Sequence, residues 1–483
     1  MAIEITSDDI IPTDTSFRLK AGPGAGKTHW LINHVWNIIK NADLGKFGKV
    51  VCLTYSNIGV DTISTRLGKT NFVEVSTIHS FLYTNLIKPY LYLIADKYGF
   101  SMTNFSGLVD DYILDDYLTL EKVQNELKRK SPKTYINPTC WSTFLKDLKW
   151  VLKDNNEGKL SCLSRSPINK YNGTSYPAPN GTGIIYKKIA WNHGIMHYDD
   201  VNFFAYKLII EYPWLAKVLS IAYPFIFIDE FQDTNPIQAF IFQQICSRSG
   251  FMGVIGDVAQ SIYGFQGASP KCFNDFVIPN VKEFVIRQNR RSTPQIINFL
   301  NCLRHDIKQE SIINEEGPIV KFLVGEKKKA FTYAQELVKE DILVLSYSNI
   351  ETNSLRYQIL EGRGDEKAIK IDDIVDSNSD RKLLVTAFIK AIEHAKQAKF
   401  KYAFNALERA GIKSDECVDR LRKLMQLQNI DHLTMTEFVE SIRKQGFTIS
   451  SLRAGKAKNF YDSHTYGQIA QSISIEEDNG NQR

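Results

Sequence analysis

The stretch Ala21-Gly22-Pro23-Gly24-Ala25-Gly26-Lys27-Thr28 decides the fold of this chain. Its three glycines permit backbone angles and a close approach that a side chain would block, so successive backbone N–H groups can point at phosphate oxygens. Lys27 places a positive charge beside the outer phosphates, and the Thr28 hydroxyl can bind Mg²⁺. The stretch predicts a phosphate-binding loop, with ATP or GTP as the expected ligand.

The segments on either side of this stretch support the interpretation. Residues 17–20 have the character of a strand, and residues 29–39 are an apolar segment with the pattern of a helix. Strand, loop and helix follow one another in the order that a phosphate-binding loop requires. The alternative is a glycine-rich surface turn, which the adjoining Lys-Thr pair and helix pattern disfavour.

Composition limits the class of protein. The 483 residues are 43% hydrophobic, and this length suggests about three domains. We find no apolar run of roughly eighteen residues and no secretory signal, so the sequence predicts a cytoplasmic protein without a membrane span. The seven cysteines form no Cys-x-x-Cys pair. A net charge of +5 permits a polyanionic partner without requiring one.

A second motif points to nucleotide hydrolysis. Residues 224–228 form a short apolar run typical of a buried parallel strand, and Asp229-Glu230-Phe231-Gln232-Asp233 follows directly. Ligands of open α/β sheets bind at the carboxyl ends of the strands, where the phosphate-binding loop also lies. Asp229 would hold Mg²⁺, and Glu230 would orient and deprotonate the attacking water. The alternative is an acidic turn that caps the next helix.

Further motifs follow in a fixed order. A third apolar run, residues 251–255, leads into Gly256-Asp257-Val258-Ala259-Gln260-Ser261-Ile262-Tyr263-Gly264-Phe265-Gln266-Gly267-Ala268, and Arg287-Gln288-Asn289-Arg290-Arg291-Ser292 comes later. Together with Leu53-Thr54-Tyr55-Ser56-Asn57, Ser76-Thr77-Ile78-His79-Ser80 and His197-Tyr198-Asp199-Asp200, this series resembles the UvrD/Rep group of superfamily 1 helicases from residue 17 to about residue 294.

The resemblance implies a role for each matching residue. Lys27, Asp229, Glu230, Gln260 and Arg291 would be catalytic. Gln260 would respond to the γ-phosphate, and Arg291 would stabilise charge on the transferring phosphoryl group. Residues expected to contact single-stranded DNA are Thr54, Tyr55, Asn57, Thr77, His79, Tyr263 and Phe265, with the aromatic rings stacking on bases. A Tyr or Phe at any of these positions can equally be a core residue.

The chain also departs from the family pattern. The family carries a Gln before the phosphate-binding loop that reads adenine, whereas residues 1–16 contain no Gln, so the choice between ATP and GTP stays open. Arg290 stands where an aromatic residue normally stacks on the base, and its flat guanidinium can stack there instead. Phe265-Gln266 replaces the usual Trp-Arg.

The motifs imply an α/β fold: a P-loop, RecA-like parallel-sheet domain with inserted helical subdomains and a partial second RecA-like domain. We expect the first RecA-like domain to use residues 1–82 and 201–286, with a largely helical insertion at 83–200 that includes a long exposed loop at 161–183. Residues 287–370, with a strand at 341–346, would begin the second RecA-like domain. Residues 371–483 would form a second helical insertion and a polar tail.

The resemblance implies an ATP-dependent 3′–5′ DNA helicase or translocase that uses ATP and Mg²⁺ and acts on single-stranded DNA or on a duplex with a single-stranded tail. Motifs V and VI have no match, so we expect a chain truncated before motif V. The alternative is an ATP-gated DNA sensor that licenses a partner nuclease, as GajB-like members do in antiviral defence. The pathway, whether repair, replication or defence, stays open.

Overall fold

The computed structural model describes residues 2–45, 47–105, 107–109, 117–130, 135–153, 159–171, 174–248, 250–264, 267–277, 280–338, 342–346, 351, 355, 371, 374–376, 378–397, 399–409, 411–413 and 415–470. The chain divides into two compact units, Met1–Val320 and Lys321–Arg483. Each unit has its own hydrophobic core.

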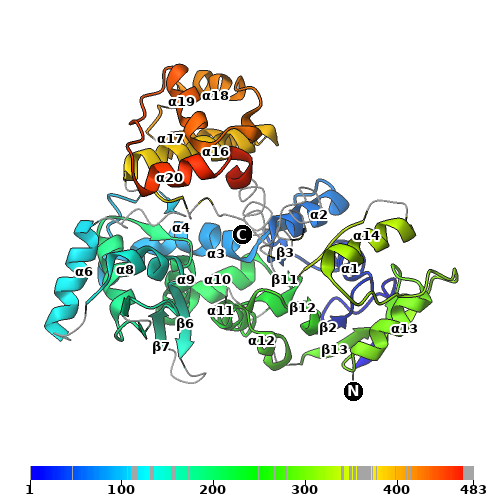
Figure 1. The fold of residues 1–483 in the computed structure, drawn as a ribbon. Coiled ribbons are helices and arrows are strands. Elements are labelled where there is room, and N and C mark those ends of the chain that lie inside the picture. Colours follow the sequence, from blue (N-terminus) through cyan, green and yellow to red (C-terminus); the bar gives the residue numbers. More distant parts are fainter. Residues whose placement is uncertain are drawn as a thin grey trace. The chain divides into compact units, whose positions relative to one another are not determined.

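A seven-stranded sheet organises the first unit, and every strand pair in it is parallel (Figure 1). Parallel strands must be joined by crossovers, so each motif that follows a strand emerges at the same edge. In spatial order the strands are β1 (Ile3–Ile5), β13 (Lys282–Ile286), β2 (Phe17–Ala21), β12 (Phe251–Gly256), β11 (Phe225–Ile228), β3 (Val50–Thr54) and β4 (Val73–Thr77). This architecture confirms the predicted fold class.

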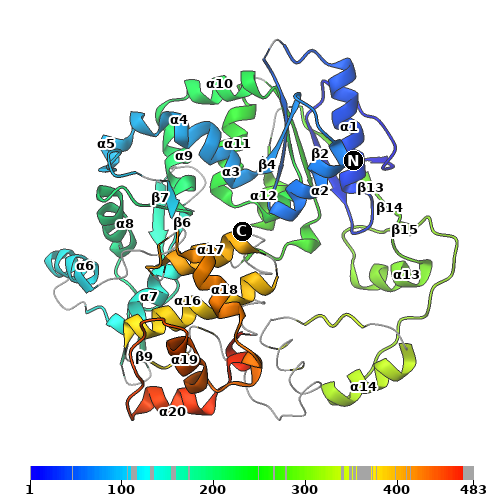
Figure 2. The same cartoon turned by 90° about the horizontal axis from the view of Figure 1, so that it is seen from above.

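Alternate residues of the strands face opposite layers. Phe225 and Phe227 of β11 pack in one core with α1 (Lys27–Asn41) and α2 (Asn57–Leu67). Ile226 and Ile228 pack in the other core, which contains residues of α3 (Ile78–Leu82), α9 (Asp200–Glu211), α10 (Trp214–Ala222) and α11 (Pro236–Cys246). Figure 2 shows α1 on one side of the strands and α3 and α11 on the other. Both faces are covered, which explains why the strands read as continuous apolar runs.

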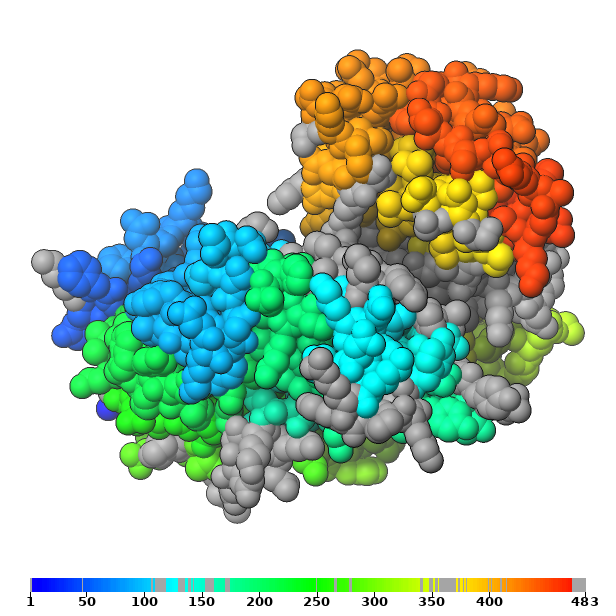
Figure 3. Space-filling model, turned by 90° about the vertical axis from the view of Figure 1, so that its left-hand side faces the viewer, coloured from blue at the N-terminus to red at the C-terminus, as the bar shows by residue number. Residues whose placement is uncertain are grey.

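Between β4 and α9 the chain forms a region of helices and short strand pairs. Its elements are η1 (Tyr83–Ile87), α4 (Lys88–Tyr90), η2 (Leu91–Leu93), α5 (Ala95–Tyr98), β5 (Leu108–Val109), α6 (Tyr117–Lys130), α7 (Pro138–Lys146), β6 (Lys149–Lys153), β7 (Lys159–Leu163), β8 (Asn169–Tyr171), β9 (Thr174–Tyr176), α8 (Thr182–Asn192) and β10 (Met196–His197). Tyr90 packs edge-on against Trp214 of α10, and Figure 3 shows light-blue residues of this region against green ones.

The predicted long loop at residues 161–183 is wrong. Strand β7 extends to Leu163, β8 pairs with β9 in an antiparallel ladder, and α8 begins at Thr182. The polar, glycine- and proline-rich composition concealed these strands, because backbone pairing across three residues needs little apolar sequence. The expectation of a largely helical insertion is therefore incomplete.

A buried acidic residue ties this region to α9. Asp200 is fully buried, and its carboxylate lies 2.8 Å from the Lys187 ammonium of α8. The indole N–H groups of Trp150 and Trp191 and the backbone N–H of His197 also donate to it. Burial alone would raise the pKa of Asp200, but the Lys187 ammonium and the His197 side chain lower it below its usual value. Lys187 is thus the structural partner of the His197-Tyr198-Asp199-Asp200 motif quoted from the sequence.

The rest of the first unit completes the sheet edge. Its elements are the short helices η3 (Phe231–Asp233), η4 (Val258–Gln260) and α12 (Pro270–Asp275), helix α13 (Pro294–Leu303), and the parallel strand pair β14 (Gln288–Asn289) and β15 (Glu310–Ser311).

The second unit is helical in its described part. Its elements are α14 (Lys327–Val338), α16 (Ser379–Lys396), α17 (Phe400–Arg409), α18 (Cys417–Met425), η7 (Ile430–His432), α19 (Met435–Lys444) and α20 (Lys456–Ser463). Phe388, Ile389 and Ile392 of α16 are buried in the core of this unit. Residues 342–346 adopt neither helix nor strand, so the strand predicted at 341–346 is wrong for these residues. The five domain boundaries stay predictions.

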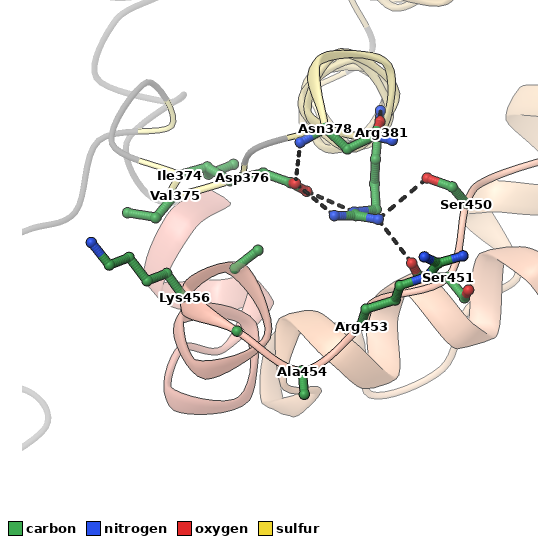
Figure 4. Close-up of a pocket in the computed structure, with 12 residues that line it drawn as sticks. Ile374, Val375, Asp376, Asn378, Arg381, Ser450, Ser451, Arg453, Ala454 and Lys456 are labelled. Atoms are coloured by element: carbon green, nitrogen blue, oxygen red, sulfur yellow. Dashed lines mark hydrogen bonds and ion pairs between the residues drawn. The ribbon is translucent and has the colours of Figure 1, made fainter.

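Arg381 of a buried ion pair connects the start of α16 to a second segment of this unit. The Arg381 guanidinium contacts the Asp376 carboxylate through two nitrogens and donates to the Ser451 carbonyl (Figure 4). The pair lies beside a pocket of about 850 Å³ whose rim includes Arg453 and Lys456. No helix in the described part of the chain has the length and apolar character needed to cross a membrane.

We predict that Lys187→Met destabilises the first unit by roughly 3–5 kcal/mol, because the Asp200 carboxylate would stay buried without its cation. Lys188→Met is the matched control, since Lys188 is the exposed neighbour of Lys187. Denaturant unfolding followed by fluorescence and circular dichroism measures both. Equal stability of the two variants would contradict the role given to Lys187.

Candidate nucleotide site and nucleic-acid interface

The predicted phosphate-binding loop joins β2 to α1. Gly24 and Gly26 have φ values of 73° and 83°, in the left-handed region that favours glycine. Gly26 is the N-cap of α1 and, having no side chain, makes no cap hydrogen bond to the N–H groups of the first turn. Such a helix start attracts an anion through its N–H groups and its dipole. The loop therefore has the conformation that phosphate binding requires.

Lys27 and Glu230 face each other across the sheet edge. The Lys27 Nζ lies 3.4 Å from Glu230 Oε2, although the two residues are 203 positions apart. Burial and, secondarily, the charge of Glu230 raise the pKa of the neighbouring Asp229 to about 7. A buried carboxylate beside a threonine-bearing loop offers the oxygen ligands that Mg²⁺ prefers. Asp229 and Thr28 thus fit the expected metal.

Glu230 has an unusual backbone. Its φ of 53° and ψ of 42° lie in the left-handed region, which costs a non-glycine residue of order 1–3 kcal/mol. The side chain is 36% exposed, and its Oε2 accepts a hydrogen bond of 2.7 Å from Gln232 Nε2. The strained backbone and the Gln232 amide hold the carboxylate toward Lys27. Residues in such conformations cluster at functional sites.

A chain of polar contacts connects Glu230 to the segment after β12. Gln232 Oε1 accepts from the Asp257 backbone N–H at 3.0 Å. Asp257 is fully buried, and its carboxylate receives Gln260 Nε2 at 2.5 Å and both terminal nitrogens of Arg304 at 2.8 and 2.7 Å. Asp257 therefore holds the Gln260 amide. The backbone N–H of the same Asp257 bonds to Gln232, and Gln232 in turn bonds to the Glu230 carboxylate.

Residues after β13 pack directly on the loop. Asn289 Nδ2 and Gln309 Nε2 donate to the Pro23 carbonyl at 2.6 and 3.1 Å, and the Arg290 backbone N–H donates to the Gly24 carbonyl. A Cβ at Gly24 would lie 2.7 Å from Asn289 Oδ1, so only glycine fits there. These contacts bring the segment of Arg290 and Arg291 to the phosphate-binding loop.

The two arginines differ in their partners. The Arg290 guanidinium forms an ion pair with Asp8, whereas the Arg291 guanidinium is exposed and bonds to no described residue. Of the other loop residues, Ala21, Gly22 and Ala25 are buried against the sheet and its neighbours, and Thr28 is half-buried in the first turn of α1.

The residues predicted to bind DNA lie at or beyond the carboxyl ends of β3, β4 and β12. Tyr55 and Tyr263 pack against each other, with ring centroids 4.3 Å apart. Thr54 is buried, Asn57 begins α2, and the Thr77 hydroxyl accepts from the Ser80 backbone N–H. Phe265 lies outside the described residues. Tyr55 and Tyr263 form one aromatic pair at the sheet edge.

His79 is enclosed by its neighbours. It is 7% exposed and stacks on Tyr198, with ring centroids 3.4 Å apart and an interplanar angle of 7°. Burial lowers the pKa of His79 to about 3, so the ring is neutral at physiological pH. As placed, it presents no cation to a phosphate, and its contact with DNA stays a prediction.

Sequence reasoning missed four residues of this site: Gln232, Asn289, Arg304 and Gln309. Gln232 lies in the motif at residues 229–233 and Asn289 in the motif at residues 287–292. Each motif follows a strand, so the position of both residues beside a strand end could have identified them. Arg304 and Gln309 reach the site only because the chain returns after α13, and no local pattern marks them.

Comparison with known proteins identifies the family. The model of the UvrD/REP helicase N-terminal domain matches residues 6–278. The chain is 27% identical to Gabija protein GajB of Bacillus cereus (strain HuB5-5) over 63% of this chain and 49% of that protein. It is 26% identical to ATP-dependent DNA helicase Rep of Buchnera aphidicola subsp. Schizaphis graminum, covering 74% of this chain and 54% of Rep.

ATP-dependent DNA helicase PcrA of Staphylococcus aureus is 23% identical over 73% of this chain and 46% of PcrA. The chain thus spans about half the length of the curated relatives it matches. The match to the family model extends over the phosphate-binding loop, the Asp229-Glu230 pair and the Asp257 segment. With these elements assembled at one edge of a parallel sheet, the chain belongs to the UvrD/REP helicase family.

Proposed function

We propose that this chain forms the nucleotide-hydrolysing part of a DNA helicase or translocase of the UvrD/Rep type, driven by ATP or GTP. The observation that carries the proposal is the 3.4 Å approach of Lys27 to Glu230 at the carboxyl edge of the sheet. The helicase relatives Rep and PcrA are named ATP-dependent. Movement along DNA in the 3′–5′ direction is an expectation from the family.

Hydrolysis follows from the positions of these side chains. The loop N–H groups and Lys27 would bind the outer phosphates, drawing the ammonium away from Glu230. Thr28 and Asp229 would hold Mg²⁺, which when bound offsets phosphate charge. Glu230, still fixed by Gln232, would then take a proton from the attacking water. Gln260 and Arg291 would contact the γ-phosphate from opposite segments.

Coupling to DNA would run through the segment after β12. Gln260, held by Asp257, is three residues from Tyr263, which packs on Tyr55. A shift of Gln260 toward a bound γ-phosphate would therefore displace Tyr263 and change its packing on Tyr55. We propose that Tyr55, Tyr263 and Phe265 stack on bases, with Thr54, Asn57, Thr77 and His79 near the sugar-phosphate backbone or nearby bases. Single-stranded DNA or a tailed duplex is the proposed substrate, and a cytoplasmic location stays a prediction.

The similarity to GajB favours a second candidate. In that case the chain would belong to an ATP-gated DNA sensor that licenses a partner nuclease. Both candidates use the same nucleotide and DNA sites. Strand displacement by the isolated full-length protein favours the helicase, and nucleotide-dependent DNA cleavage only in the presence of a nuclease favours the sensor.

Lys27→Ala should abolish nucleotide binding and hydrolysis, because the loop loses its only side-chain cation at the phosphates. Glu230→Gln should retain binding and lower kcat by about 10²–10⁴-fold, since the amide cannot take the proton. Calorimetric binding and phosphate release with and without single-stranded DNA measure both. Lys217→Ala, an exposed position on α10, is the control. Normal hydrolysis by Lys27→Ala would refute the assignment of the loop.

Gln232→Leu should lower kcat roughly 10- to 100-fold with little change in KM, because Glu230 loses a charge-assisted hydrogen bond and Asp257 loses an acceptor for its N–H. Gln244→Leu on α11 is a matched change of an amide that makes no side-chain hydrogen bond to the described residues. An unchanged kcat in Gln232→Leu would show that this amide does not position Glu230.

Tyr55→Ala should weaken single-stranded DNA binding roughly 5- to 150-fold, as expected for one lost base stack of about 1–3 kcal/mol. Tyr55→Phe keeps the ring and should bind like the parent chain. Tyr92→Ala removes an exposed ring from another part of the unit and serves as the control. Fluorescence anisotropy with a labelled oligonucleotide distinguishes these cases, and equal affinity of all variants would remove Tyr55 from the interface.

A further inference from the structure

The segment that follows α13 joins the strand before the phosphate-binding loop to the segment after β12. Arg304 directly follows α13, and its guanidinium donates to both carboxylate oxygens of Asp257, at 2.8 and 2.7 Å. The same guanidinium donates to both carboxylate oxygens of Asp306, at 3.1 and 2.9 Å. Asp306 in turn lies 3.1 Å from the ammonium of Lys20, near the end of β2. Charges of opposite sign therefore alternate along a row of side chains from β2 to Asp257.

The Asp257 carboxylate is the most buried member of this row. Its side chain is 1% exposed, and a buried carboxylate that loses its paired cation is strongly destabilising. Arg304 supplies the cation for Asp257 in the described part of the chain. Two neutral groups also donate to this carboxylate: the Ala259 backbone N–H to Oδ1 at 3.2 Å and Gln260 Nε2 to Oδ2 at 2.5 Å. Asp257 is thus the junction at which Arg304 and Gln260 meet.

The charge of Arg304 determines how firmly Asp257 holds Gln260. When the Gln260 amide moves away, Asp257 loses one hydrogen bond and keeps its two bonds to Arg304. Without Arg304, the amide would be one of the few groups left to offset a buried charge, and its departure would cost far more free energy. A γ-phosphate competes with Asp257 for the donor groups of this amide. Arg304 therefore makes the amide available to the nucleotide.

We propose that Arg304 is a positioning residue for nucleotide hydrolysis. It acts through Asp257 and touches no nucleotide itself. While the nucleotide site is empty, Arg304 maintains the carboxylate that holds Gln260. When a triphosphate binds, Arg304 offsets the charge of Asp257 and so lets the amide turn to the γ-phosphate. The inference rests on the proposed function and deepens it, because it names the residue that controls the response of Gln260 to the γ-phosphate.

A double-mutant cycle on ATP hydrolysis tests this role. Arg304→Met removes the cation and should lower kcat/KM by roughly 10- to 100-fold. Gln260→Ala should lower kcat/KM as well. In the Gln260→Ala background, Arg304→Met should cause a further loss of less than about threefold, because the amide through which Arg304 acts is gone. The same fold loss in both backgrounds would overturn the proposal.

A conservative variant and a matched control accompany the cycle. Arg304→Lys keeps the charge beside Asp257 but lacks the planar fork, so its kcat/KM should lie between those of the parent chain and Arg304→Met. If Arg304→Met does not fold, as judged by circular dichroism, Arg304→Lys takes its place in the cycle. Arg248→Met changes an exposed arginine of the same unit and should hydrolyse ATP like the parent chain. Parental kcat/KM in the Arg304 variants would contradict the proposal.

Nucleotide binding separates positioning from a merely structural role. Gln260 can contact the γ-phosphate of a triphosphate and has no such partner in ADP. Arg304→Met should therefore weaken binding of the β,γ-imido analogue of ATP, with Mg²⁺, by roughly 3- to 30-fold and change the affinity for ADP by less than about twofold. Calorimetric titration measures both affinities.

The outcomes of the titration are distinct. Equal weakening of the two nucleotides in Arg304→Met would overturn the role of Arg304 and leave the proposed function intact. If the parent chain neither binds nor hydrolyses ATP, the proposed function and this inference fail together.

Discussion

The contact between Lys27 and Glu230 is the constraint on which the rest of this site depends. It exists because β2 and β11 are parallel strands of one sheet, so the segments that follow them leave at the same edge. The ammonium offsets part of the charge of two adjacent carboxylates, of which Asp229 is buried and has a raised pKa. The negative charge that Lys27 leaves unbalanced at this site favours the binding of a cation. The Lys27 ammonium can then leave Glu230 and bind a phosphate.

Around this contact, the site is held from both sides. Gln232 bonds to Glu230, and Asp257, itself paired with Arg304, bonds to Gln232. On the other side, Asn289 and Gln309 hold the carbonyl of Pro23 in the loop. Side chains positioned by buried hydrogen bonds lose little freedom when a ligand binds. The region after β13 thereby becomes part of the nucleotide site, although it is distant in sequence. The same region carries Arg290, which meets Asp8 from the start of the chain.

The sequence predicted those features that depend on local pattern. Gly24 and Gly26 predicted the loop, and the apolar runs before Asp229 and before the motif after β12 predicted strands β11 and β12. These predictions are correct because a buried strand and a positive φ leave strong local signals. The burial of His79 was not predictable, since it depends on stacking with Tyr198 from 119 positions away. The β8–β9 pair and the contacts of Arg304 likewise arise from tertiary pairing, which no local pattern records.

The most direct test of the nucleotide site is an experimental structure of the chain with Mg²⁺ and a non-hydrolysable nucleoside triphosphate. We expect Lys27 Nζ within hydrogen-bonding distance of the outer phosphates, the metal beside Thr28 and Asp229, and Glu230 separated from Lys27 but still bonded to Gln232. A triphosphate bound elsewhere, with the Lys27–Glu230 pair intact, would contradict the assignment of this site.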